Sequence, residues 1–241
     1  MKKSTNRFLL TIISLCIVPL SYGQFRNSGS TDVNGQTMTS AQLTNMQWSS
    51  ALRKKVEDIK PAYLFKENYL LAELTLPNGK MVIAKNKFKL DLQESKLYFL
   101  DSANEEMEVV NPVKKVLFVE QDGNSTPVSF EKGFPPVDKL TENNFYQVVV
   151  SGKASLLLDT KFVEVNRIEY PSGAPVKRTD KLLTYYGSAG STVKLAKTEN
   201  ILELLADKSK EISAYIQKEN IKVQRQSDLE KVFTYYNSLF Q

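Results

Sequence analysis

Histidine is absent from this chain of 241 residues, and cysteine occurs only once. Without an imidazole there is no Ser-His-Asp or Cys-His catalytic set, and no histidine ligand for zinc, copper or haem. A single thiol excludes an internal disulfide bond and a cysteine cluster for zinc or iron–sulfur. The sequence therefore predicts no metal site, no cofactor and no catalytic residue of the common nucleophile–base type.

Extreme composition is also absent, because 24% of the residues are charged and 41% are hydrophobic. These values are typical of globular proteins and fit neither a disordered chain nor an integral membrane protein. The formal net charge is +5. Nucleic-acid binding requires a clustered basic face, and this small excess gives no argument for a nucleic-acid partner.

Residues 1–23 have the three parts of a secretory signal peptide. Three cations precede an apolar run over residues 8–20, and Ser-Tyr-Gly at 21–23 places small residues before the break. The apolar run has 13 residues, whereas a membrane-spanning helix needs about 20. We therefore expect export with cleavage after Gly23, and no transmembrane span in the mature chain.

Cleavage would remove the cations Lys2, Lys3 and Arg7 together with Cys16. Lipid attachment generally requires a small residue before the cysteine, but Leu15 stands there, so we interpret Cys16 as part of the apolar core of the signal. Removing three of the 32 cations leaves 29 against 27 acids, a net charge of +2. The mature chain has no cysteine, so its stability must come from a hydrophobic core.

Residues 24–60 are interpreted as a linker and a short amphipathic helix. Residues 24–39 are polar and rich in Gly, Ser, Thr and Asn, which predicts a flexible connection. A helical stripe ending before a proline follows, and it consists of Trp48, Leu52, Val56 and Ile59. A partly ordered arm is the alternative.

Residues 61–197 have the pattern of an antiparallel β-domain. Asn78-Gly79 and Asp122-Gly123 each separate two apolar runs, which is the strongest short signal for a hairpin. Two separate strands are expected at 154–158 and 162–170. A polar loop is expected at 171–179, and the tip of a last hairpin at 187–190.

Residues 198–241 have a helical period and are predicted to form a tail packed on the β-domain. Ser227 and Glu230 form a capping box, which predicts the start of the last helix. Strands followed by helices indicate the α+β class. The expected sheet is an antiparallel meander, or a partly closed barrel-like sheet, followed by the helical tail.

Several short motifs occur in a characteristic order: Gly-Phe-Pro-Pro-Val at 133–137, Phe-Tyr-Gln-Val at 145–148 with Gly152-Lys153 and Leu-Leu-Leu at 156–158, and in the tail Leu204-Leu205, Asp207-Lys208, Tyr215-Ile216 and Tyr235-Tyr236-Asn237. In this order they resemble a family of uncharacterised secreted proteins of Gram-negative bacteria. The resemblance covers most of residues 60–241. It implies a secreted β-rich domain with a helical tail, and it implies no activity, ligand or catalytic residue.

Two Ser-x-x-Lys patterns occur, one at Ser129 and Lys132 and the other at Ser191 and Lys194. In Ser-Lys acyl-enzymes the serine opens a helix, so the lysine lies one turn further on and can accept its proton. Both patterns here fall in predicted strands, where residues three apart point to opposite faces. We interpret both as chance matches.

Three other patterns have simpler interpretations than a functional site. The acids Glu105, Glu106 and Glu108 offer paired carboxylates for glycoside hydrolysis, but adjacent acids usually mark a solvated strand edge. Residues 122–124 are too short for a calcium loop and fit a hairpin turn. Residues 187–191 lack the Gly-Lys-Ser/Thr ending of a phosphate loop and fit a hairpin tip.

Aromatic residues make up 10% of the chain and include the pairs Tyr185-Tyr186 and Tyr235-Tyr236. Alternation predicts that each pair places one ring inward and one partly outward. Rings at the core edge, with hydrogen-bonded hydroxyls, are the commoner arrangement. A glycan-binding surface or a lipid cavity is the alternative.

The missing histidine, cysteine and nucleophile motifs favour a non-catalytic protein. The signal peptide favours an exported protein of the cell envelope, located in the periplasm, outside the cell or at the outer membrane. Its role would be structural or the binding of an envelope protein, a glycan or a lipid. The alternative is a histidine-free hydrolase that uses carboxylates. The loops at 133–136 and 171–179 are the expected interaction surface, because the longest loops of a rigid scaffold commonly carry function.

Export is the first testable prediction. Protein from the native host should have an intact mass that corresponds to a chain beginning at Gln24, with or without cyclisation to pyroglutamate. Retention of residues 1–23, or diacylglycerol on Cys16, would contradict it.

Overall fold

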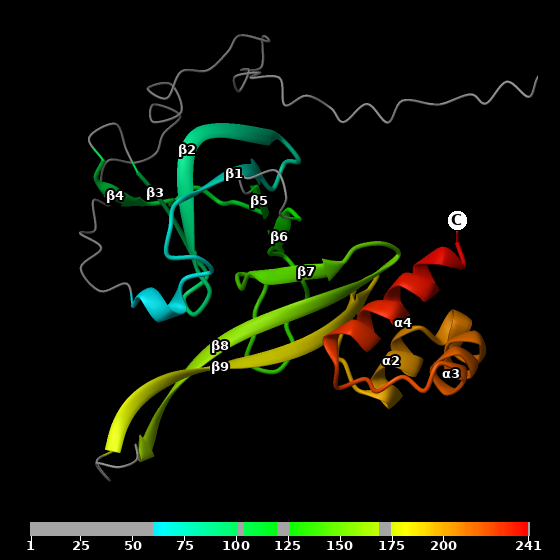
Figure 1. Ribbon diagram of the computed structural model, residues 1–241. Coiled ribbons are helices and arrows are strands. Elements are labelled where there is room, and N and C mark those ends of the chain that lie inside the picture. Colours follow the sequence, from blue (N-terminus) through cyan, green and yellow to red (C-terminus); the bar gives the residue numbers. More distant parts are fainter. Residues whose placement is uncertain (1–59, 101–103, 120–125, 169–174, 241) are drawn as a thin grey trace, which may run out of the picture.

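The computed structural model describes residues 60–100, 104–119, 126–168 and 175–240 (Figure 1). The predicted signal peptide, linker and short helix therefore lie outside the described residues. The same is true of the predicted turn at 122–124.

The described residues form a ten-stranded antiparallel sheet in the order β10-β9-β8-β7-β6-β5-β1-β2-β3-β4. The strands are β1 (Leu70–Thr75), β2 (Met81–Asp91), β3 (Lys96–Leu100), β4 (Glu106–Glu108), β5 (Lys115–Val119), β6 (Val128–Glu131), β7 (Tyr146–Val150), β8 (Ala154–Ile168), β9 (Pro175–Ala189) and β10 (Thr192–Leu195). The pairing of β1 with β5 joins two meanders. No pairing in the described ranges joins β4 to β10, so the sheet is open. The predicted α+β class with an antiparallel meander is confirmed.

The turn between β1 and β2 shows how the local sequence brings these two strands together as a hairpin. Gly79 has a φ of +80°, a conformation that residues with a Cβ rarely adopt. Its N–H donates to the carbonyl of Leu76 at 2.9 Å, and the N–H of Lys80 donates to the side chain of Asn78 at 3.0 Å. The hairpin expected at Asn78-Gly79 is therefore present.

The first hydrophobic cluster consists mainly of side chains from β1–β6, together with Phe162 of β8. Its rings include Phe118 and Phe130, whose centroids lie 6.0 Å apart at 80°, the edge-to-face arrangement that aromatic pairs favour. Phe65 lies against both rings. The buried members are Ala72, Leu74, Val82, Phe88, Leu90, Leu92, Leu97, Phe99, Val113, Val116, Phe118, Phe130, Phe145 and Phe162.

Strands β8 and β9 each have 15 residues, longer than the sequence indicated. The prediction of separate strands at 154–158 and 162–170 was wrong, because β8 continues through Asp159, Thr160 and Lys161. The predicted loop at 171–179 was also wrong from Pro175 onward, where β9 begins. The two errors have different causes. The polar residues 159–161 interrupt the apolar pattern of β8, although Asp159 and Phe162 are buried, whereas residues 175–179 of β9 are exposed and have no apolar alternation to mark a strand.

The hairpin tip expected at 187–190 lies further along the chain, at Gly190-Ser191, between β9 and β10. Gly187 is instead buried inside β9. A Cβ at this position would lie 2.6 Å from Leu204 Cδ2 and 2.8 Å from Phe233 Cζ. The glycine suits this position because side chains of two helices lie against the strand, and any Cβ would force them to shift.

Those helices are α2 (Thr198–Leu204), α3 (Ser209–Lys218) and α4 (Gln226–Ser238), with short 3₁₀ turns η2 (Pro61–Tyr63) and η3 (Ala206–Lys208). Helices α2, α3 and α4 lie on one face of β7–β9 (Figure 1). Their apolar side chains form the second hydrophobic cluster with Leu156 of β8. Residues from 134 to 140 cover the opposite face, where Leu157 points. None of the helices in the described ranges is long and apolar enough to cross a membrane.

The predicted capping box at Ser227 and Glu230 was wrong. Helix α4 already begins at Gln226, and its N-cap residue Arg225 makes no side-chain capping bond. The carboxylate of Asp228 instead accepts the N–H of Lys222 at 3.0 Å, which lowers the pKa of Asp228. Asp228 is the acid of the first turn, and it bonds a main-chain N–H that precedes the helix and does not cap it.

The buried contact of α4 with the sheet generates the second prediction. Phe233 is 0% exposed, so Phe233→Ala should destabilise the protein by about 3–5 kcal/mol. Urea unfolding measures this loss. Thr234→Ala, at the exposed neighbouring position of the same helix, is the control and should change stability by no more than about 0.5 kcal/mol. Equal stability of the two variants would show that α4 is not part of the cooperative core.

Candidate functional site

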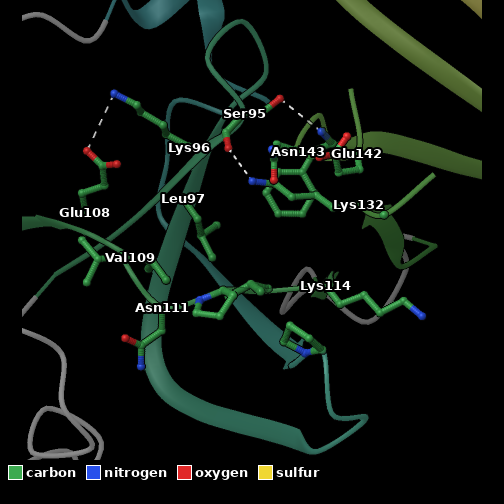
Figure 2. A pocket seen from close by; sticks show the side chains of 16 residues that line it. Ser95, Lys96, Leu97, Glu108, Val109, Asn111, Lys114, Lys132, Glu142 and Asn143 are labelled. Carbon is green, nitrogen blue, oxygen red and sulfur yellow. Dashed lines mark hydrogen bonds and ion pairs between the residues drawn. The ribbon is translucent and has the colours of Figure 1, made fainter. Parts of the chain in front are cut away.

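A pocket of about 600 Å³ opens beside β3 and β4 (Figure 2). The segment from Val109 to Lys114 forms one wall, and Lys132, Gly133, Asn143 and Phe145 form the other. Segments from both halves of the chain therefore build the pocket. Its lining mixes charged and amide groups with proline and valine side chains.

The turn between β2 and β3 fixes the top of this pocket. Asp91 is buried and accepts the N–H groups of Gln93 and Glu94 at 2.8 and 2.9 Å. Burial raises the pKa of Asp91 despite these two bonds. The turn ends at Ser95, which has a φ of 55° and whose hydroxyl accepts the N–H of Phe145 at 3.1 Å.

Lys132 is the central charged group of the pocket. Its ammonium donates to the carbonyl of Ser95 at 3.0 Å and lies 4.2 Å from the ring centroid of Phe145, a cation–π distance. Burial lowers the pKa of Lys132, and the carboxylate of Glu108 opposes this effect. Since an ammonium has three donors, the bond to Ser95 leaves donors for a bound molecule.

Ion pairs hold two further lysines of the pocket. Lys96 lies 3.9 Å from Glu108, and Lys114 lies 3.8 Å from Glu131. Figure 2 shows the Lys96–Glu108 pair on one side and the Lys132–Ser95 bond on the other. Asn143 lies on the Lys132 side and is exposed.

The two Ser-x-x-Lys patterns do not form catalytic pairs. The hydroxyl of Ser129 is buried without a hydrogen-bond partner among the described residues, while Lys132 bonds to Ser95. Ser191 is exposed at a hairpin turn, and Lys194 pairs with Glu203.

The acids of β4 also have structural partners. Glu106 accepts hydrogen bonds from the hydroxyl of Tyr69 and from the ammonium of Lys89, whereas Glu108 pairs with Lys96 at the pocket. β4 is an outer strand of the sheet, in agreement with an acidic strand edge.

The tyrosine pairs lie at the edges of the core. The hydroxyl of Tyr186 donates to Asp138 at 2.9 Å, and that of Tyr236 donates to Asp207 at 3.0 Å. Tyr185 donates to Gln226, and Tyr235 stacks on Tyr215 at 4.1 Å. Through these contacts the four tyrosine rings take part in holding the fold together.

Of the two loops expected to form an interaction surface, the first packs on the protein itself. Phe134 meets Tyr146 at 5.5 Å in an edge-to-face pair. The second loop is partly strand β9.

The sequence indicated Lys132 only through the misleading Ser-x-x-Lys pattern. It did not indicate Ser95 or Asn143, because these residues come close to Lys132 only through contacts between distant segments.

Comparisons with protein-family models, with curated proteins and with solved structures find no match for this chain. Its resemblance to secreted proteins therefore remains a prediction.

Within the described ranges, no group of three or more acidic, histidine or cysteine side chains is arranged to hold a metal ion.

The environment of Lys132 generates the third prediction. After reductive ¹³C-methylation, the Lys132 resonance should titrate at a lower pH than an ordinary lysine, because burial disfavours its charged form. Glu108→Gln should lower that pKa further by removing the nearby negative charge. Glu142→Gln, which changes another carboxylate of the pocket lining, is the matched control. A normal pKa, or equal effects of the two variants, would contradict this account.

Proposed function

We propose that this chain is an exported, non-catalytic protein of the cell envelope that binds a glycan in the Lys132 pocket. The observation that carries the proposal is the composition of the pocket lining. Charged and amide groups, among them Lys132, Glu142 and Asn143, face a space of about 600 Å³. Ligand sites of this size commonly use a few placed polar groups to orient their ligand.

The arrangement of these groups fits a sugar better than a lipid. Pro77, Val109, Val110 and Pro112 supply apolar surface suited to the C–H face of a sugar ring. The opposite wall supplies the ammonium of Lys132 and the amide of Asn143, which are suited to hydroxyl and N-acetyl oxygens. A lipid chain would leave these polar groups without partners, at a cost in binding free energy.

The carboxylates support binding rather than hydrolysis. A glycosidase needs one carboxyl in a desolvated position to act as general acid. The buried carboxyls of the described structure are Asp91, Asp159 and Asp228, and none of them lines the pocket. Of the pocket acids, Glu108 pairs with Lys96 and Glu142 is exposed.

Export is supported by the sequence of residues 1–23, which has the three parts of a secretory signal peptide. A periplasmic or surface location would bring the pocket close to envelope glycans. The role is therefore proposed as recognition of such a glycan, with no chemical step.

The proposal predicts glycan binding that depends on the pocket. Chitotetraose added to ¹⁵N-labelled protein should shift the amide resonances of Ser95, Lys132 and Asn143. Asn143→Ala should weaken binding about fivefold, the effect of about 1 kcal/mol for one lost hydrogen bond. Asn166→Ala, at an exposed position on β8 outside the pocket, is the matched control and should bind normally.

Deacetylated chitotetraose and lauric acid distinguish the ligand classes. Preference for the acetylated sugar would support the proposal. Binding of laurate in place of the sugar would overturn the glycan assignment, and turnover of the sugar would overturn the non-catalytic one.

A further inference from the structure

The distal parts of β8 and β9 form a two-stranded β-arm, defined as residues 159–168 and 175–184. Phe162 is still buried in the first cluster, and the part of the arm beyond it extends away from the rest of the sheet (Figure 1). β7 pairs with β8 only at Leu156, Leu157 and Leu158. β10 pairs with β9 only from Tyr186 to Ala189. Beyond these points the described strands pair only with each other, in a register that continues to Ile168 and Pro175.

Two hydrogen bonds reveal which main-chain groups point away from the arm. The N–H of Phe162 donates to the side chain of Gln93 at 3.0 Å, and the carbonyl of Tyr185 accepts the N–H of Ala196 at 2.8 Å. In an antiparallel ladder, alternate residues direct their N–H and C=O groups outward. On β9, counting back from Tyr185, the outward residues are Leu183, Lys181, Thr179 and Lys177. The pairing of Phe162 with Lys181 gives the same alternation.

The two open edges of the arm differ. On the β8 edge, Gln93 already covers Phe162, and Lys60 of the segment before η2 pairs with Glu164 at 2.5 Å. On the β9 edge, no backbone hydrogen bond within the described ranges reaches the outward groups of Lys177, Thr179 or Lys181. Among the described residues, the β9 edge therefore has the main-chain groups that another strand can bond.

The β9 edge is rich in basic residues and has exposed apolar side chains. Residues 175–183 contain Lys177, Arg178 and Lys181 but one acid, Asp180. Asp180 is already paired with Arg167 of β8, at 2.5 Å. Two adjacent leucines are unusually exposed, Leu182 by 54% and Leu183 by 49%. A partner strand that complements this edge would carry acidic and apolar side chains.

We propose that the β9 edge of the arm binds an extended acidic segment of a partner polypeptide by strand addition. The main-chain hydrogen bonds would come from Lys177, Thr179, Lys181 and Leu183, as in other cases in which a peptide extends a sheet. The lysines select negative charge on the partner. Such a site is distinct from the Lys132 pocket, so each proposal can fail without the other.

The distribution of apolar side chains favours a polypeptide over a membrane surface. Membrane insertion needs apolar side chains gathered on one face. Successive residues of a strand point to opposite faces, so Leu182 and Leu183 lie on different faces of the arm. An added strand contacts both faces at once and makes use of both leucines.

The test uses the full-length mature protein and a blocked peptide of about eight residues that alternates glutamate and valine. Amide hydrogen exchange, followed by NMR, should show new protection of about tenfold or more at Lys177, Thr179 and Lys181. The inward amides of Val176, Arg178 and Asp180 should already be protected in the free protein, since they belong to the β8–β9 ladder. Protection at every second residue distinguishes strand addition from docking through side chains alone.

Variants at Thr179 isolate the main-chain contribution. Thr179→Pro removes one outward N–H without removing a β8–β9 ladder bond, and proline is tolerated on such an edge. It should weaken peptide binding about tenfold, whereas Thr179→Ala, which keeps the N–H, should bind almost normally. Retained protection of Arg178 and Asp180 verifies that the arm remains folded.

Charge reversal tests the selectivity. Lys177→Glu combined with Lys181→Glu should shift preference to a lysine–valine peptide of the same length. Three outcomes would overturn the proposal: no alternating protection, equal binding by the proline and alanine variants, or binding of phosphatidylglycerol vesicles without binding of the acidic peptide.

Discussion

The side chain of Asn237 bonds to both main-chain groups of Ala154, and the placement of the helices depends on this contact. Its Oδ1 accepts the N–H of Ala154 at 3.0 Å, while its Nδ2 donates to the carbonyl of Ala154 at 2.9 Å. The amide thus replaces a neighbouring strand at the first residue of β8. Gly152 leaves room for it, because any Cβ there would overlap the Asn237 side chain.

Neighbouring polar contacts strengthen the same junction. Asp207 pairs with Lys153 at 3.0 Å and accepts the hydroxyl of Tyr236. Both contacts lower the pKa of Asp207. They fix the 3₁₀ turn η3 and the C-terminal end of α4 to the start of β8, so that Phe233 reaches the position left open by Gly187. The helical layer and the long strand therefore depend on each other: burial on the helix side anchors β8, and the anchored β8 extends outward as the arm.

The sequence predicted those features that depend on local patterns. Asn78-Gly79 indicated its hairpin because the turn needs positive φ, and the helical period identified the tail because its apolar face is continuous. The extent of β9 was missed, since its distal end is exposed and has no apolar alternation, and the continuity of β8 was missed because the polar residues 159–161 interrupt its apolar pattern. The capping box failed because α4 begins at Gln226, one residue before Ser227, so the serine lies inside the helix and not at its N-cap. The pocket required knowledge of tertiary contacts, as Ser95 and Lys132 are 37 residues apart.

Five of the motif residues on which the predicted resemblance rests come together in the structure. Gly152, Lys153, Asp207, Tyr236 and Asn237 are distant in sequence and meet at the junction between β8 and the helices. A contact of this kind constrains residue types strongly, because each partner fits only the others.

The residues assigned to ligand binding lie elsewhere. Lys132 and Asn143 belong to segments that line a pocket, and Lys177 and Thr179 belong to an open strand edge. The fold does not depend on the residue types that line the pocket or form the strand edge. A resemblance that rests on the residues of the junction therefore predicts the architecture and does not predict a ligand. In this chain, the residues that join the helices to β8 are therefore different from the residues proposed to bind a glycan or a partner strand.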